Sequence, residues 1–140
     1  MIDIITSSPL FKGLHREVIS GIVENAKERN FTTGQLIIQE GDSLTGLCII
    51  IEGKASIENN MGDTLFTRGV GESLGEMTLI DLGARSATVK AKTDVKIAEI
   101  DLEYMSSLFD KDSKLLATVA INIARILSNR LRESDEDLKV

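Results

Sequence analysis

Histidine and cysteine each occur only once in this chain of 140 residues, as His15 and Cys48. Zinc sites and metal-binding barrels need several imidazole or thiolate ligands, so the composition argues against metal chemistry. Cys48 lies in the apolar run Leu47–Ile51, where it is expected to fill a buried position. A single cysteine is typical of a reducing compartment. We assign His15 no role and expect it to face solvent in the first turn of a helix.

Long apolar runs and excess positive charge are also missing. No run approaches the ~20 residues of a membrane span, and Met1–Thr6 lacks the basic start and apolar core of a signal peptide. We therefore expect a soluble, cytoplasmic protein without membrane contact. The 16 basic and 22 acidic residues give a net charge of −6. A phosphate backbone would repel such a chain, so direct binding of nucleic acid is not expected.

Apolar residues make up 42% of the chain, enough to fill the core of one domain. Helical spacing predicts a helix from His15 to Arg29. Short apolar or alternating runs separated by glycine and asparagine then predict several strands, with a hairpin between Lys54–Glu58 and Thr64–Thr67. Val95–Ile100 alternates as a last strand. Many short strands at this spacing favour a β-barrel or β-sandwich.

Two helices are predicted after the last strand. Asp101 is placed to cap a short helix at Leu102–Phe109, and Asp112 or Ser113 to cap a longer one that ends near Glu133. Apolar residues form a stripe along the longer helix: Leu116, Val119, Ala120, Ile123, Leu127 and Leu131. This stripe is longer than one small barrel can cover. It suits packing on the barrel, pairing with a second copy, or covering a ligand.

Residues 71–91 combine groups that suit an anion held beside a polyol. Gly75 lets a ligand approach the main chain without a Cβ in the way, and the amides of the short helical turn that follows can point at negative charge. Arg85 supplies a fixed positive fork. Glu76 is an acceptor when ionised and suits neighbouring hydroxyls. A phosphate and a ribose hydroxyl presented together make a nucleotide.

The same stretch resembles the phosphate-binding cassette of cyclic-nucleotide-binding domains, the module of the catabolite activator protein and of protein kinase A regulatory subunits. The family pattern of Gly-Glu followed by Arg-Ser-Ala-Thr-Val-x-Ala is met by Gly75-Glu76 and by residues 85–91, at the family spacing of nine. Ala84 replaces a common proline, and Thr78 a common alanine. Neither change removes a contacting group. An ordinary Glu–Arg pair on a surface loop is the alternative interpretation.

The resemblance implies a role for each cassette residue. Glu76 would accept from the ribose 2′-hydroxyl, and Arg85 would pair with the cyclic phosphate. The other residues would line the ligand: Leu74, Gly75, Met77, Ser86 and Ala87. Ser86 does not distinguish cAMP from cGMP, and cAMP is favoured. No cofactor or catalytic residue is implied.

The resemblance also narrows the fold to an eight-stranded β-roll with flanking helices in a single domain. We expect an N-terminal helical segment over about 1–30, the roll over 31–100, C-terminal helices over 101–133 and an acidic tail over 134–140. The long helix would be the lid and the site of homodimer formation. On it, Arg130 is expected to stack on the base or pair with Glu76, with a solvated arginine as the alternative.

Four functions are open at this point. The first is a regulatory module that binds a cyclic nucleotide and moves its C-terminal helix to signal to an unknown effector. An enzyme on a β-barrel would need a general base, metal cluster or activated nucleophile, for which the chain has no clustered histidines and no Cys–His arrangement. A catabolite-activator-type transcription factor would need a helix-turn-helix domain, and only nine residues follow Leu131. The last is a docking or dimerisation unit that has lost its ligand, against which Glu76 and Arg85 argue.

Overall fold

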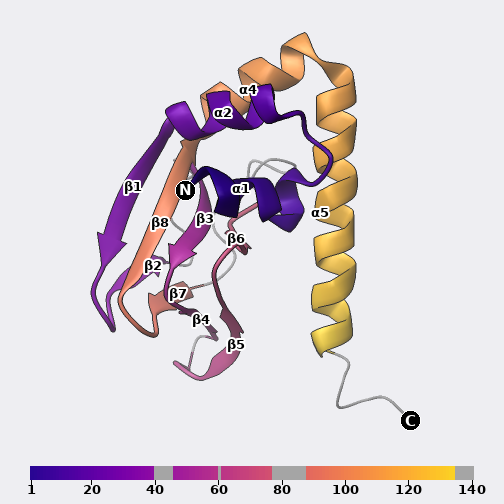
Figure 1. Ribbon diagram of the computed structural model, residues 1–140. Helices are drawn as coiled ribbons and strands as arrows, with labels where there is room; N and C mark the ends of the chain where they lie inside the picture. The colour runs from indigo at the N-terminus through magenta and orange to yellow at the C-terminus, as the bar shows by residue number, and fades with distance from the viewer. Residues whose placement is uncertain (40–45, 60, 77–87, 135–140) are drawn as a thin grey trace.

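The computed structural model describes residues 1–39, 46–59, 61–76 and 88–134. Helices flank a sandwich of strands (Figure 1). The N-terminal helical elements are α1, the 3-10 helix η1 and α2, which span Ile2–Ser7, Pro9–Phe11 and Arg16–Glu24. The C-terminal helices are α4, Leu102–Lys111, and α5, Ser113–Ser134.

Eight described strands form two antiparallel sheets of four, which confirms the predicted roll. The first sheet has the order β1-β8-β3-β6, with the strands spanning Ala26–Phe31, Val95–Asp101, Gly46–Glu52 and Ser73–Leu74. The second has the order β2-β7-β4-β5, with the strands spanning Leu36–Ile38, Thr88–Ala91, Ala55–Glu58 and Thr64–Arg68. The predicted hairpin is β4 paired with β5.

Strand β3, in the interior of the first sheet, is buried on both faces. Leu47, Ile49 and Ile51 join the core beneath the helices, whereas Cys48 and Ile50 point into the core between the sheets. Successive strand residues face opposite sides, so a strand covered on both sides reads as a continuous apolar run. The buried position expected for Cys48 is therefore confirmed, with 3% of the residue exposed.

The helix predicted over residues 15–29 is wrong beyond Glu24. Helix α2 ends there, and the Asn25 amide donates to the carbonyl of Gly21. Residues 26–31 instead form β1, which pairs antiparallel with β8 along its whole length. This segment is polar and largely exposed between its ends, so it has no apolar stripe to hold a helix on the core. Backbone pairing at the edge of the sheet decides its conformation. His15, just before α2, is exposed as expected.

The two C-terminal helices begin where their caps predict. The Asp101 carboxylate accepts from the Glu103 amide at 2.8 Å, and Asp112 Oδ1 accepts from the amides of Lys114 and Leu115 at 3.0 and 3.2 Å. These bonds satisfy amides that have no partner inside their helices. The acidic tail beyond residue 134 lies outside the described residues.

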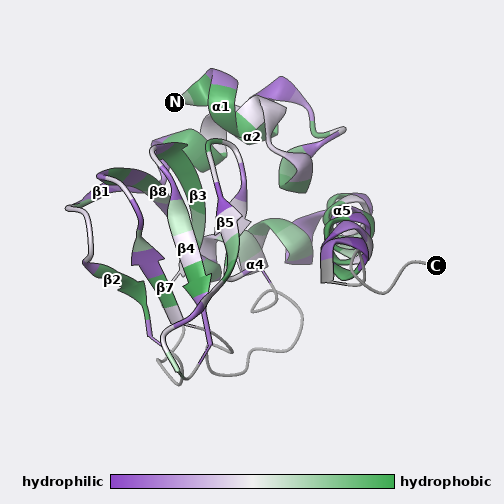
Figure 2. Cartoon of the chain, turned by 90° about the horizontal axis from the view of Figure 1, so that it is seen from below, coloured by the Kyte–Doolittle hydropathy of each residue, from purple (hydrophilic) through white to green (hydrophobic). Residues whose placement is uncertain are grey.

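Helix α5 runs down the side of the sandwich, as Figure 2 shows almost along the helix axis. Its inward face is formed by Leu115, Val119, Ile123 and Ile126, which are at most 9% exposed. Only part of the predicted apolar stripe therefore faces the core. Val119 and Ile123 pack inward, whereas Leu116, Ala120 and Leu131 are exposed.

Asn122 fixes the position of α5 against the N-terminal segment. The residue is 3% exposed, and its Nδ2 donates to the carbonyls of Leu10 and Lys12, both at 2.9 Å. A buried carbonyl without a donor is costly, so this one amide satisfies two groups of the chain that would otherwise oppose docking.

Candidate functional site

The predicted cassette begins on β6, at the edge of the first sheet. Ser73 and Leu74 pair with Ile49 and Cys48 of β3, and Leu74 is buried in the core between the sheets. Gly75 follows with φ of +76°, a left-handed conformation that glycine adopts without steric cost. The chain thereby turns out of the strand and brings Glu76 beneath α5.

A tight turn before β6 holds this edge in place. The Gly69 amide donates to Glu72 Oε2 at 2.6 Å, and the Gly71 amide donates to the Ile50 carbonyl at 2.8 Å. Gly71 has φ of +87°, a left-handed conformation that glycine adopts without steric cost. The approach to the cassette is therefore fixed by the backbone of the sheet.

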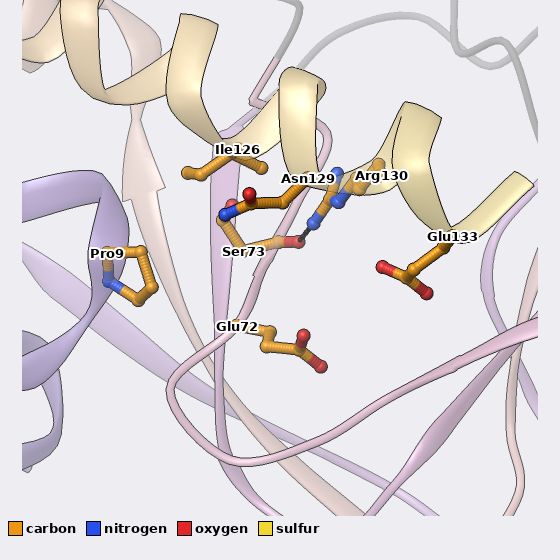
Figure 3. Close-up of a pocket in the computed structure, with 7 residues that line it drawn as sticks. All are labelled: Pro9, Glu72, Ser73, Ile126, Asn129, Arg130 and Glu133. Atoms are coloured by element: carbon orange, nitrogen blue, oxygen red, sulfur yellow. Dashed lines mark hydrogen bonds between the residues drawn. The ribbon is translucent and has the colours of Figure 1, made fainter. Parts of the chain in front are cut away.

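Glu76 is the central described side chain of the site. Only 1% of it is exposed, and its Oε1 pairs with Arg130 Nη1 of α5. Arg130 Nη2 also donates to the carbonyl of Ser73 at 2.9 Å, as Figure 3 shows. One arginine of α5 thus contacts both the buried carboxylate and the strand that leads to it. A buried carboxylate needs such a partner, because isolated charge in the interior is costly.

A second ion pair lies about one turn further along α5, and in this pair the helix supplies the carboxylate and the strand supplies the arginine. Glu133 accepts from Arg68 Nη1 of β5, at 3.0 Å to each of its carboxylate oxygens. Together the two pairs hold the last turns of α5 on the roll. Residues 130 and 133 also line a small pocket of about 100 Å³ with Pro9, Glu72, Ser73, Ile126 and Asn129 (Figure 3).

Among the predicted site residues, the structure describes Leu74, Gly75, Glu76 and Arg130. It brings Glu76 and Arg130 together, which is one of the two roles expected of the arginine. Leu74 supports the site from the core. The other predicted contacts, Met77, Arg85, Ser86 and Ala87, lie outside the described residues.

Sequence reasoning missed Arg68, Asn122 and Glu133. An arginine at the end of an exposed strand and a glutamate near a helix end are ordinary surface residues in a pattern. Their partners are 65 positions apart, so no local signal connects them. Asn122 interrupts the apolar side of α5. A polar residue at an inward position was the one sequence signal that could have indicated a buried hydrogen-bonding contact.

In the part of the chain that the structure describes, no group of three or more His, Cys, Asp or Glu residues is arranged to hold a metal ion. None of the described helices combines the length and apolar character needed to cross a bilayer.

A comparison with family models matches residues 28–112, more than half of the chain, to the cyclic nucleotide-binding domain. The chain belongs to this family. It is 34% identical to the cyclic AMP receptor protein of Thermus thermophilus over 135 residues, which cover 94% of this chain and 61% of that protein. The crystal structure of the catabolite activator protein of the same organism superposes with a TM-score of 0.73, again at 34% identity, covering 94% of this chain and 62% of that chain.

Other relatives carry the same module in different contexts. The solved N-terminal domain of a transcriptional regulator from Streptomyces coelicolor is 26% identical, with a TM-score of 0.75 and coverage of 99% of this chain and 96% of that domain. Glutaminase 2 of Bradyrhizobium diazoefficiens is 30% identical over 87% of this chain but only 19% of its own length. The chain spans about three fifths of the length of the cyclic AMP receptor protein that it matches.

We predict that replacing Arg130 with Met destabilises the fold by about 3 kcal/mol, because it leaves the buried Glu76 carboxylate without its cation. Urea unfolding of the single variants and of Arg130→Met/Glu76→Gln measures the effect. The double variant is expected to recover much of the loss, since its buried group is neutral. Arg132→Met, two positions along on the exposed side, is the control and should change little. Additive losses in the double variant would contradict the pairing.

Proposed function

We propose that this chain is a regulatory module that binds a 3′,5′-cyclic nucleotide, with cAMP favoured and cGMP the alternative, and signals through α5. The observation that carries the proposal is the buried Glu76 carboxylate, presented by the turn at Gly75 and paired with Arg130 of the C-terminal helix. Membership of the family supports the ligand class, as does the cyclic AMP named in the receptor protein of Thermus thermophilus to which the chain is similar.

In the proposed complex, the C-terminal end of the cassette binds the phosphate and its N-terminal end binds the ribose. Arg85 pairs with the cyclic phosphate, and Ser86, Ala87 and Met77 line it, as the resemblance implies. A carboxylate has several acceptor sites, so Glu76 can accept a ribose hydroxyl while Arg130 engages Oε1. The ligand thereby contacts a residue that α5 also holds. A ligand can move α5 only if it binds one position of the helix more tightly than another. Because Glu76 would contact both the ligand and Arg130, it can make the affinity for the ligand depend on the position of α5.

Replacing Arg85 with Leu should weaken cAMP binding by about 3 kcal/mol or more, because charge-assisted bonds to the phosphate are lost. Replacing Glu76 with Ala should cost less. Isothermal titration calorimetry with purified wild type and variants measures both. Analysis of the nucleotide after the titration tests the enzyme alternative, and stoichiometric binding without turnover is the expected result. Undiminished cAMP affinity in Arg85→Leu would overturn the assignment of the cassette.

We further propose that two copies of the chain associate through α5. Its outward face carries large apolar residues, Leu116, Ile121 and Leu131, which are 44%, 52% and 64% exposed, together with alanines that allow close approach. Exposed apolar surface along one helix suits a second helix. Because dimer formation needs no ligand, this face also fits the alternative of a docking or dimerisation unit.

Sedimentation velocity tests the dimer with the variant Ile121→Glu, which places a charge on the exposed apolar face. We expect wild type to sediment as a dimer and the variant as a monomer with an unchanged fold. Ser106→Glu adds the same charge at an exposed position of α4 and is the control. A wild-type monomer at micromolar concentration, with and without cAMP, would argue against the interface.

The output of the module is expected to be an effector protein or domain that α5 contacts. A cytoplasmic location, and the absence of direct contact with membranes or nucleic acid, stay predictions from the composition.

A further inference from the structure

An open groove of about 420 Å³ lies between the N-terminal helical elements and the turn that joins β5 to β6. It is lined by Asp3, Ile4 and Ser7 of α1, by Pro9 of η1 and by residues 70–72 of the turn. None of the residues proposed above to bind the nucleotide or to form the dimer lines this groove. It is therefore a separate surface, to which the proposed function assigns nothing.

The wall that the turn contributes is rigid. The Gly69 carbonyl accepts from the Glu72 amide at 3.1 Å, and the positive φ of Gly71 is the conformation that a type II turn requires at its third residue. Two backbone hydrogen bonds join the turn to Ile50 of β3: the Ile50 amide donates to the Glu72 carbonyl at 3.0 Å, and the Ile50 carbonyl accepts from the Gly71 amide at 2.8 Å. A wall that is already ordered loses little conformational freedom when a partner binds.

This turn presents an apolar side chain to solvent. Val70 occupies its second position and is 55% exposed, although small or polar residues and proline are usual in turns. Ile4 and the exposed Pro9 also line the groove. A single exposed apolar residue is ordinary, but three that line one concave surface suit an apolar side chain of another molecule.

The charge of the groove indicates what kind of molecule fits it. Its lining includes the carboxylates of Asp3 and Glu72, and no lysine, arginine or histidine is among its described lining residues. Neither carboxylate forms an ion pair with another described residue. The chain as a whole has a net charge of −6, so its field also attracts positive charge and repels an acidic partner.

We propose that this groove docks a segment of an effector protein in which an apolar side chain is flanked by lysines or arginines. The apolar side chain contacts Val70, Ile4 and Pro9, and the basic side chains pair with Asp3 and Glu72. Because no nucleotide-binding residue takes part, this proposal and the proposed function can fail independently of each other.

Nuclear magnetic resonance of the ¹⁵N-labelled chain tests the docking with two capped peptides, Lys-Leu-Phe-Lys and its acidic counterpart Glu-Leu-Phe-Glu. The basic peptide should shift the amide signals of residues 3–7 and 69–72, because it offers both the apolar side chain and the opposite charge. The acidic peptide should leave them in place. Equal shifts from both peptides, or no shift in the groove at millimolar basic peptide, would overturn the proposal.

The double variant Asp3→Asn/Glu72→Gln removes both negative charges of the groove. Glutamine keeps a side-chain oxygen that can accept from the Gly69 amide, so the turn is preserved. The dissociation constant for the basic peptide should rise about fivefold, as expected for the loss of two exposed ion pairs, and the difference should shrink at high salt. Glu17→Gln/Asp110→Asn removes two charges at exposed positions of α2 and α4 and is the matched control.

Two further outcomes would contradict the proposal. An equal loss of affinity in the control variant would mean that the net charge, and not the groove, attracts the peptide. Groove signals that shift when the protein alone is diluted would mean that a second copy of the chain occupies the groove. An unchanged spectrum on dilution, with weaker peptide binding only in Asp3→Asn/Glu72→Gln, is the result that we expect.

Discussion

The ion pair between Glu76 and Arg130 is the interaction on which the site depends. A carboxylate that is 1% exposed is stable in the interior only with a cation beside it, and here the cation comes from α5. The strand end that presents the carboxylate and the helix that neutralises it are therefore coupled before any ligand binds. The second ion pair, Arg68 of β5 with Glu133 of α5, also holds α5 on the roll, with the carboxylate now on the helix.

Sequence patterns predicted most of the architecture, because most of it depends on local rules. The capped starts of α4 and α5, the β4–β5 hairpin and the burial of Cys48 in β3 each follow from spacing, from an apolar run or from a single capping carboxylate. Helix α2 was predicted five residues too long. The end of that segment is decided by pairing with β8, some 70 positions away, and no local pattern carries that information.

The site divides in a similar way. The resemblance of residues 71–91 to a known cassette made Glu76 a candidate ligand-binding residue, and helical spacing made Arg130 its candidate partner. Arg68, Glu133 and Asn122 could not be found, since each is defined by a contact with a distant segment. These contacts dock α5 on the rest of the molecule together with its buried apolar face. The proposed cassette residues are thus close together in the sequence, whereas the contacts that connect the cassette to α5 join segments that are far apart in the sequence.

Amide hydrogen exchange along α5, measured with and without saturating cAMP or cGMP, tests the coupling most directly. If the nucleotide engages the carboxylate that holds Arg130, the amides of residues 126–133 should change their protection on binding, while those of β3 in the core should not. Unchanged exchange in those last turns of α5, in a protein shown to be saturated with nucleotide, would contradict the account.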